Sequence, residues 1–445
     1  MSDALSIFAA ARDAPHATAL RHGDESYTFA ELAALTRKRI DELQHARSAV
    51  PFALTGSNSL PTVLTLYALL ERRVPVLLLH PRLTEPEREA EVRAAGRHDL
   101  KAAADAAAIL YTSGTTGTPR GAVLTRAALI ASARASAANL GWVDGDCWLL
   151  AMPIGRIGGL SILTRCLLAR KAVALEPSFD AATLPARIES TRSTLISLVP
   201  TMLSQVLDAH PHWAAPARLR AILVGGAAAS ASLLQRAAER RLPIVITYGC
   251  TETCSQIVAT PYARRYDTAA CGAGRVLSGA ELRVRNGHLQ ARGAMLMAGY
   301  LGEPPRRADD WFDTGDLGGI DAEGNVLVEA RRSDLLVTGG ENVYPAEVEH
   351  VLQHCPGVRE AGVFGVADPV WGHTVAAALV AATDPPDDAL LLGYLNERLA
   401  PHKRPRQICF VPSLPHTPAG KLDRPALERM ACSLRPLRPA TSTRT

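Results

Sequence analysis

Residues 108–121 constrain this chain more than any other segment, because they place glycines and hydroxyl side chains directly after an apolar run. Residues 106–110 are apolar and predict a short buried strand. The following loop contains three glycines, four threonines, one serine, one proline and one arginine. Glycines permit a tight turn whose N–H groups converge, and the hydroxyls and the arginine add donors for an anion. We therefore expect a phosphate-binding loop before a helix over residues 127–138, made of Thr112, Ser113, Gly114, Thr115, Thr116, Gly117 and Arg120.

This loop is not the familiar P-loop, in which Lys and Ser or Thr directly follow the last glycine, because its arginine follows Pro119. Its residue order resembles the phosphate loop of the adenylate-forming enzymes, which include acyl-CoA synthetases, luciferases and the adenylation domains of peptide synthetases. That family usually has Lys at the position of Arg120. The resemblance implies an enzyme that uses ATP and Mg²⁺ to activate a carboxylic acid. The alternative is a polar turn with a purely structural role.

Length, charge and composition limit the number of domains and the kinds of binding partner that this chain can have. At 445 residues the chain is too long for one ordinary core, so two or three subdomains are expected. Its formal net charge is only +4 and its basic residues are scattered, so nucleic acid is not an expected partner. Charged residues interrupt the most apolar stretch, residues 60–79, which predicts a helix and a strand rather than a membrane anchor. Eight dispersed cysteines predict free, mostly buried thiols and a cytoplasmic location, whereas the oligomeric state is open.

The pattern along the chain predicts an α/β fold. Helical segments alternate with apolar strands expected at residues 147–152, 172–175, 194–198, 219–224 and 242–247, which favours mostly parallel sheets with flanking helices. Short strands and turns over residues 287–299 predict a small β-rich subdomain. We expect a large N-terminal domain (1–330) that binds ATP and the acid. A small mobile α+β domain (331–430) and a disordered tail (431–445), rich in Arg, Pro, Ser and Thr, follow it.

Two of the expected strands end in loops suited to a ligand, and ligands of open α/β sheets bind beyond the carboxyl ends of strands. The first loop contains Gly225, Gly226 and Ala227. The second contains Tyr248, Gly249, Thr251 and Glu252, and resembles the Tyr-Gly-x-Thr-Glu motif of the adenylate-forming family. A tyrosine can present a flat face to a purine, a threonine can reach a phosphate oxygen, and a glutamate can hold Mg²⁺. Each residue taken alone has a structural alternative.

Three further residues take their predicted roles from the resemblance. Asp316 follows a glycine turn, where a carboxylate can accept both hydroxyls of a ribose, although an Asx-turn is the alternative. The family pattern adds Arg331, in the hinge between the two domains, as a second ribose contact. It also places Lys421 between the incoming carboxylate and the α-phosphate. Together with Thr251 and Glu252, Lys421 completes the expected catalytic group.

Within this family the segments 157–162, 248–258 and 339–345 resemble those of the o-succinylbenzoate–CoA ligases of menaquinone biosynthesis. The resemblance implies that Gly339 and Gly340 line the channel for the pantetheine arm of CoA, and that Gly158 helps to form the acid site. Such an acid has a second carboxylate, which needs a cation if it is buried. We expect Arg156 to be this cation, where relatives commonly have His, with neighbours Ser255 and Gln256. The alternative is a surface arginine that anchors the loop.

Other functions share the same motifs. Another aryl- or acyl-CoA ligase, or a stand-alone adenylation enzyme that loads a carrier protein, would use every catalytic residue named above. A nucleotide sensor without chemistry is the non-enzymatic alternative. We expect such a sensor to lack Lys421 or Glu252, and both are present.

Overall fold

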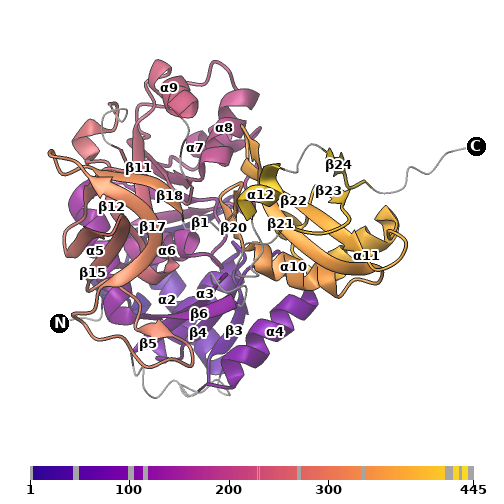
Figure 1. Cartoon of the computed structure of the whole chain (residues 1–445). Helices are drawn as coiled ribbons and strands as arrows, with labels where there is room; N and C mark the ends of the chain where they lie inside the picture. The colour runs from indigo at the N-terminus through magenta and orange to yellow at the C-terminus, as the bar shows by residue number, and fades with distance from the viewer. Residues whose placement is uncertain are drawn as a thin grey trace, which may run out of the picture. The chain divides into compact units, whose positions relative to one another are not determined.

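The computed structural model describes residues 4–43, 50–98, 105–113, 119–227, 229, 231–267, 272–331, 336–415, 424–429 and 433–438 (Figure 1). The chain divides into two compact units. The larger comprises Met1–Pro81, Val92–Thr112 and Gly121–Arg332, and the smaller comprises Arg82–Glu91, Ser113–Arg120 and Ser333–Thr445. The predicted α/β class, with a large N-terminal part and a smaller C-terminal part, is confirmed.

A nine-stranded sheet forms the centre of the larger unit. Its strands are, in order, β13 (Arg275–Val276), β12 (Ser255–Ala259), β11 (Ile244–Cys250), β10 (Ala221–Val224), β9 (Leu195–Leu198), β7 (Cys147–Leu150), β8 (Ala172–Leu175), β1 (Thr18–His22) and β2 (Glu25–Thr28). The six strands from β11 to β1 are parallel, and the strands outside them are antiparallel. The strand expected to end at residue 247 continues to Cys250, because its last residues pair with β12.

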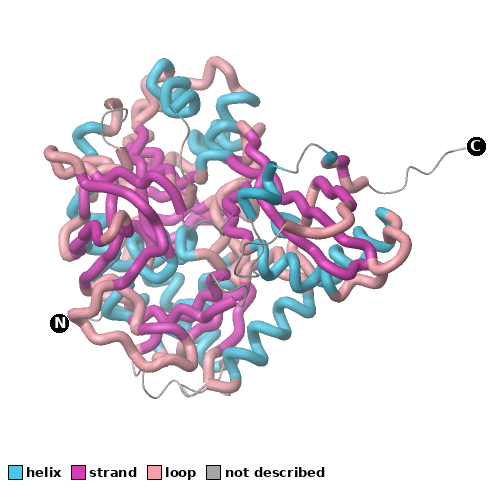
Figure 2. The backbone as a smooth tube through the Cα atoms, viewed as in Figure 1, coloured by secondary structure: helices cyan, strands magenta, loops and turns pink. Residues whose placement is uncertain are grey.

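Helices cover both faces of this sheet, which is why its strands are apolar throughout. In β7 the residues Trp148 and Leu150 belong to one hydrophobic cluster, whereas Cys147 and Leu149 belong to another. Because side chains alternate along a strand, the two clusters lie on opposite faces. Helices α5 (Arg126–Leu140) and α6 (Ile157–Ala169) pack into the first cluster, and α7 (Leu184–Ser190), α8 (Pro200–Ala209) and α9 (Ala231–Glu239) pack into the second (Figure 2).

A second, five-stranded sheet carries the glycine-rich segment. Its order is β16 (Gly299–Tyr300), β6 (Pro119–Thr125), β5 (Ala106–Ser113), β4 (Val76–Leu79) and β3 (Phe52–Thr55). The helix and strand expected over residues 60–79 are α3 (Leu60–Glu71) and β4, and α4 (Glu85–Gly96) follows. Strand β6 was not predicted; its Pro119 and two polar neighbours interrupt the apolar pattern that indicates a strand. Arg120 therefore lies in a strand that neighbours β5 rather than in a loop.

Helices α1 (Ile7–Asp13) and α2 (Phe29–Glu42) complete the N-terminal part. Helix α2 begins with a capping box, in which Thr28 Oγ1 accepts from Glu31 N at 3.2 Å and Glu31 Oε2 accepts from Thr28 N at 2.7 Å. This arrangement satisfies N–H groups that have no partner inside the helix. Among the described residues, no helix is both long and apolar enough to cross a membrane.

The predicted β-rich subdomain is a four-stranded antiparallel sheet. It consists of β14 (Ala280–Arg285), β15 (His288–Gly293), β17 (Phe312–Ile320) and β18 (Val326–Arg331). Asn286 and Gly287 join β14 to β15, with φ of 51° and 77°. A two-residue hairpin with positive φ at both positions favours this residue pair, so the local sequence fixes the register.

The smaller unit contains a six-stranded sheet. Its order is β20 (Glu341–Val343), β19 (Leu336–Thr338), β22 (Gly372–Ala381), β23 (Gln407–Phe410) and β24 (Arg435–Pro436), and β21 (Val358–Asp368) also pairs with β22. Helices α10 (Pro345–Gln353), α11 (Asp388–Arg398) and α12 (Arg424–Arg429) belong to the same unit.

The expectation of a disordered tail is wrong for residues 433–438. Strand β24 pairs with β23, and Arg435 donates two hydrogen bonds of 2.8 Å to the carboxylate of Asp388. Leu437 is buried in the hydrophobic cluster of the sheet. Composition alone missed this because one bidentate ion pair and one apolar side chain are enough to dock a short strand at a sheet edge.

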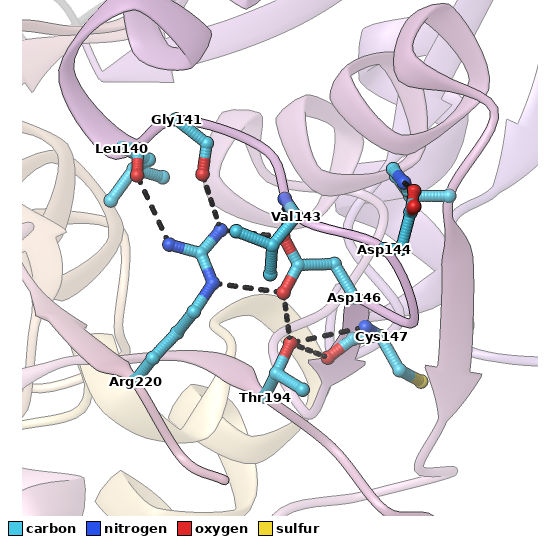
Figure 3. Close-up of polar contacts among 9 residues, drawn as sticks. Leu140, Gly141, Val143, Asp144, Asp146, Cys147, Thr194 and Arg220 are labelled. Atoms are coloured by element: carbon cyan, nitrogen blue, oxygen red, sulfur yellow. Dashed lines mark hydrogen bonds and ion pairs between the residues drawn. The ribbon is translucent and has the colours of Figure 1, made fainter.

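A buried ion pair fixes the amino ends of the central strands (Figure 3). The carboxylate of Asp146, before β7, accepts from Arg220 Nε at 2.8 Å and Nη2 at 2.5 Å. It also accepts from Thr194 Oγ1 at 2.7 Å. Arg220 in turn donates to the carbonyls of Leu140 and Gly141 at the end of α5. Since ligands bind at the carboxyl ends of such strands, this network has a structural role.

Candidate active site

Two of the predicted nucleotide residues are in direct contact. Tyr248, in β11, donates its hydroxyl to Asp316 Oδ2 at 2.8 Å, and Asp316 is 1% exposed. Burial, and then the nearby carboxylate of Asp316, raise the pKa of Tyr248 far above its ordinary value, so the phenol stays protonated and donates. The Asx-turn of this segment belongs to Asp313, whose Oδ1 accepts from Gly315 N at 2.9 Å. The carboxylate of Asp316 has a long-range partner in Tyr248.

The backbone of Arg331 completes the same group. Strands β17 and β18 pair in a register that places Arg331 directly opposite Asp316. The two residues predicted to bind a ribose are thus cross-strand neighbours, although fourteen residues separate them in the sequence.

Glu252 lies beside this group in the turn Thr251–Thr253 and is 9% exposed. Its Oε1 accepts from Tyr300 Oη at 2.9 Å and from Thr112 Oγ1 at 3.1 Å. Thr112 ends the strand that leads into the glycine-rich loop, so the structure joins the predicted Mg²⁺ ligand to the predicted phosphate loop. Tyr300 was not identified from the sequence, because one tyrosine after a glycine in a β-rich segment carries no distinctive signal.

The residues present fit Mg²⁺. No group of three His, Cys, Asp or Glu side chains suited to a metal gathers within the described residues. Mg²⁺ typically keeps several waters and takes one or two protein carboxylates together with substrate phosphates. A single carboxylate whose Oε1 is already held by two hydroxyls and whose Oε2 accepts no hydrogen bond from the described residues matches that mode of binding.

Close approaches explain why Gly225, after β10, and Gly249, within β11, are glycines. A Cβ at Gly249 would lie 2.0 Å from Ser255 O, so β11 and β12 pair only if that position is glycine. A Cβ at Gly225 would lie 2.2 Å from Thr247 Oγ1, which packs the loop after β10 against β11. Gly226, with φ of 82°, turns the chain before Ala227. The two loops therefore leave neighbouring parallel strands, as the sequence indicates.

Several predicted residues lie outside the described part of the chain. These are Gly114, Thr115, Thr116 and Gly117 of the loop, and Lys421. Ser113 is the last residue of β5, and Arg120, in β6, is half-buried. The loop thus joins the end of one strand to the start of its neighbour in the sheet.

Gly339 and Gly340 form the two-residue turn of the β19–β20 hairpin, with φ of 59° and 79°. A Cβ at Gly339 would lie 2.5 Å from the ring of Trp371, whose carbonyl accepts from Gly339 N at 2.9 Å. The sequence predicted a glycine loop followed by a helix, and helix α10 does begin at Pro345. The intervening hairpin was not predicted because each of its strands has only three residues.

The loop before α6 contains Arg156, the residue expected to pair with the second carboxylate of the acid. Arg156 is the N-cap residue of α6, has an extended backbone and is half-buried. A Cβ at Gly158 would lie 2.9 Å from Met152 Cε, so this loop is closely packed. Gln256 is buried and donates to Ser136 Oγ at 3.2 Å.

The cation that contacts Ser255 is Arg165, two turns further along α6. Its Nη2 lies 3.2 Å from Ser255 Oγ, and its guanidinium carbon lies 5.6 Å from the ring centroid of Trp148. Arg165 is 2% exposed, and within the described residues no carboxylate pairs with it. Burial lowers its pKa to about 10, so it is charged at neutral pH. The sequence signal was available, since this is the one charged residue inside the apolar helix Ile157–Ala169.

The backbone at Ser255 is strained. Cys254 and Ser255 have φ of 50° and 93°, and this left-handed region is unfavourable for residues other than glycine. Ser132 Oγ holds the strained segment by donating to Cys254 O at 2.7 Å. Such strain is concentrated at binding and catalytic sites, where the surrounding structure maintains it. Ser255, with this strained backbone, is the residue that contacts the buried Arg165.

The comparisons with known proteins agree with this geometry. The sequence profile of the AMP-binding enzymes matches residues 88–301, and the profile of their C-terminal domain matches residues 347–421. The chain therefore belongs to the AMP-binding enzyme family, the adenylate-forming ligases, and the resemblance seen in the sequence is confirmed.

Its relatives within that family narrow the class. The chain is 35% identical to the 2-succinylbenzoate–CoA ligase of Bacillus licheniformis, over 92% of this chain and 96% of the relative. It is also 35% identical to the 2-succinylbenzoate–CoA ligase of Listeria monocytogenes, over 94% of this chain and 97% of the relative.

Solved structures of o-succinylbenzoate CoA synthetase are also similar to this chain. One is a double mutant of o-succinylbenzoate CoA synthetase from Bacillus subtilis bound to a product analogue, OSB-NCoA. It matches with a TM-score of 0.89 and 31% identity, over 98% of this chain and all of the other. The same enzyme with the intermediate OSB-AMP gives 0.70 and 32%, over 96% and 98%. That enzyme has also been solved with AMP, and with ATP and magnesium.

Proposed function

We propose that this chain is a 2-succinylbenzoate–CoA ligase. The succinyl carboxylate attacks the α-phosphate of ATP, which forms the acyl-adenylate and releases pyrophosphate. The thiolate of CoA then attacks the acyl carbon and displaces AMP, which leaves 2-succinylbenzoyl-CoA. Relatives that carry this name and align over more than nine-tenths of the chain support the proposal.

The observation that carries the choice of acid is the buried Arg165. Its guanidinium is 2% exposed, contacts the Ser255 hydroxyl and the Trp148 ring, and pairs with no carboxylate within the described residues, so it leaves a charge for a ligand to neutralise. 2-Succinylbenzoate has a second carboxylate on its ring, and burying that anion is costly unless a cation pairs with it. A carboxylate that enters beside Ser255 would pair with Arg165 through two hydrogen bonds. A monocarboxylic acid would leave the guanidinium without this partner.

The nucleotide residues divide the remaining work. Tyr248 stacks on the purine, and Asp316 and Arg331 hold the ribose. Glu252 would hold Mg²⁺, and the ion would neutralise charge on the triphosphate. Bringing a carboxylate up to a phosphate requires that two anions approach, so further cationic groups must offset the repulsion. We assign Arg120 and Lys421 to that role, and Thr251 to a phosphate oxygen.

The C-terminal part, residues 331–430, acts as a mobile module in this proposal. It supplies Lys421 for the first half-reaction, and the turn of Gly339 and Gly340 lines the pantetheine path in the second. Neither glycine carries a side chain that could obstruct that path. The match of the C-terminal profile to residues 347–421 supports a separate module.

Pyrophosphate release across a panel of carboxylic acids tests the proposal. The panel contains 2-succinylbenzoate, 4-phenyl-4-oxobutyrate, benzoate and a fatty acid, each assayed with and without CoA. We expect 2-succinylbenzoate to give the highest kcat/KM and sustained turnover only with CoA. Preference for a monocarboxylic acid, or turnover with a carrier protein in place of CoA, would identify a different member of the family.

A further inference from the structure

Tyr300 contacts Glu252, but neither the sequence nor the proposed reaction assigns it a role. It is half-buried in β16, a two-residue strand that pairs with β6 in a register that places Tyr300 opposite Ala122. Two further backbone hydrogen bonds extend this pairing, from Leu301 N to Gly121 O at 2.7 Å and from Ala298 N to Val123 O at 2.8 Å. The position of Tyr300 is therefore set by the strand that follows the glycine-rich loop.

The same segment holds Glu252 at two points. Met297 N donates to the backbone carbonyl of Glu252 at 2.7 Å, and Tyr300 Oη donates to its side-chain Oε1 at 2.9 Å. Thr112 Oγ1 adds a third hydrogen bond, also to Oε1, at 3.1 Å. With its main chain and one carboxylate oxygen held, the side chain of Glu252 cannot rotate freely. Within the described residues, Oε2 accepts no hydrogen bond.

We propose that Tyr300 is a positioning residue that fixes the rotamer of Glu252 so that Oε2 faces the metal of the bound Mg²⁺–ATP. The inference rests on the proposed function, because it needs a nucleotide–metal site at Glu252. Hydroxyl groups that hold a ligating carboxylate typically contribute about 10- to 100-fold in metal affinity, since a free carboxylate must be ordered when the ion binds.

Tyr300 also links Glu252 to the strand that follows the glycine-rich loop. The glycine-rich loop leaves through β6, and Tyr300 is paired to that strand while it holds Glu252. Thr112 holds the same carboxylate from β5, the strand that enters the loop. Strands β5 and β6, which flank the glycine-rich segment in the sequence, are thus both linked to the carboxylate of Glu252.

Replacing the phenol hydroxyl tests this role. Tyr300→Phe keeps the ring and removes the hydroxyl that donates to Glu252. Mn²⁺ binding is measured by electron paramagnetic resonance in the presence of α,β-methylene-ATP, which cannot release pyrophosphate. We expect Mn²⁺ to bind about 10-fold more weakly to the variant, with nucleotide affinity in EDTA unchanged. In turnover assays the Mg²⁺ concentration for half-maximal rate should rise by a similar factor, and the rate at saturating Mg²⁺ should recover.

Tyr27→Phe is the matched control, because Tyr27 Oη also donates to a glutamate, Glu25, but at an exposed position away from the site. It should leave Mn²⁺ binding unchanged. If Tyr300→Phe lowers the melting temperature but leaves Mn²⁺ affinity within twofold of the wild type, Tyr300 has only a structural role and the inference fails. If the wild-type protein itself shows no nucleotide-dependent Mn²⁺ binding, the proposed function fails instead.

Discussion

Arg165→Met is predicted to change which acid this protein activates. The substitution keeps a side chain of similar length and removes the charge from a residue that is 2% exposed and lies 3.2 Å from Ser255 Oγ. Removing one partner of a buried charge pair costs about 3–5 kcal/mol, because the other charge stays buried without compensation. At about 1.4 kcal/mol per factor of ten, kcat/KM for 2-succinylbenzoate should fall by two to three and a half powers of ten.

The comparison acid is 4-phenyl-4-oxobutyrate, which has the same activated chain but no ring carboxylate. Its kcat/KM should change by less than about tenfold, because no anion faces position 165 when it binds. Pyrophosphate release is measured for both acids with wild type and variant, and the ratio of the two kcat/KM values is compared between the proteins. A thermal melt of each protein checks that the variant is folded.

Burial lowers the pKa of Arg165 to about 10, which adds a pH test. The charged form prevails below that value, so the preference for the dicarboxylate should hold at pH 7–9 and decline as the pH rises through about 10. If Arg165→Met affects both acids equally, or neither, Arg165 does not read the ring carboxylate. If Arg156→Leu separates the two acids and Arg165→Met does not, the assignment made from the sequence is the correct one.

Three other predictions concern catalysis, domain alternation and stability. Lys421→Ala should abolish adenylate formation, a loss of about 3–4 kcal/mol of transition-state stabilisation, yet leave ATP affinity by calorimetry nearly intact; a near-normal rate would exclude its role. Gly340→Leu should still release pyrophosphate in a single turnover but form no thioester, and equal loss of both half-reactions would count against a rotating module. Asp146→Asn should lower the free energy of unfolding by about 3–5 kcal/mol, measured with urea, because Arg220 stays buried without its charge partner. Burial alone would raise the pKa of Asp146, but hydrogen bonds led by that from Arg220 outweigh it and lower the pKa below its usual value. The stabilisation is therefore present above about pH 4 and is lost as the pH falls through the folded-state pKa, so wild type and variant should converge in acid.

Most of the fold could be predicted because its signals are local. Apolar runs of four or five residues predicted the central strands, and Thr28 with Glu31 predicted the start of α2. The site needed more than local signals. The motif around Tyr248 and the isolated Asp316 were both identified, yet the 2.8 Å hydrogen bond that joins them depends on the packing of two separate sheets.

The features that were missed depend on long-range pairing. Strands β6 and β16, the strand of Tyr300, pair with one another through backbone hydrogen bonds. Neither strand has the alternation of apolar and polar residues that would predict it from the sequence. The tail was assigned from its composition, which does not reveal the contact of Arg435 with Asp388. Arg165 was not identified from the sequence, because a loop next to glycines suggests a ligand site more strongly than the interior of a helix does.

The most direct test of the proposed activity is to identify the product. Purified protein is incubated with 2-succinylbenzoate, ATP, Mg²⁺ and CoA, and the mixture is analysed by mass spectrometry with AMP and ADP quantified together. The proposal predicts 2-succinylbenzoyl-CoA and AMP in equal amounts, and 2-succinylbenzoyl-adenylate when CoA is left out. Release of ADP, or an adenylate that is never converted to the CoA thioester, would contradict it.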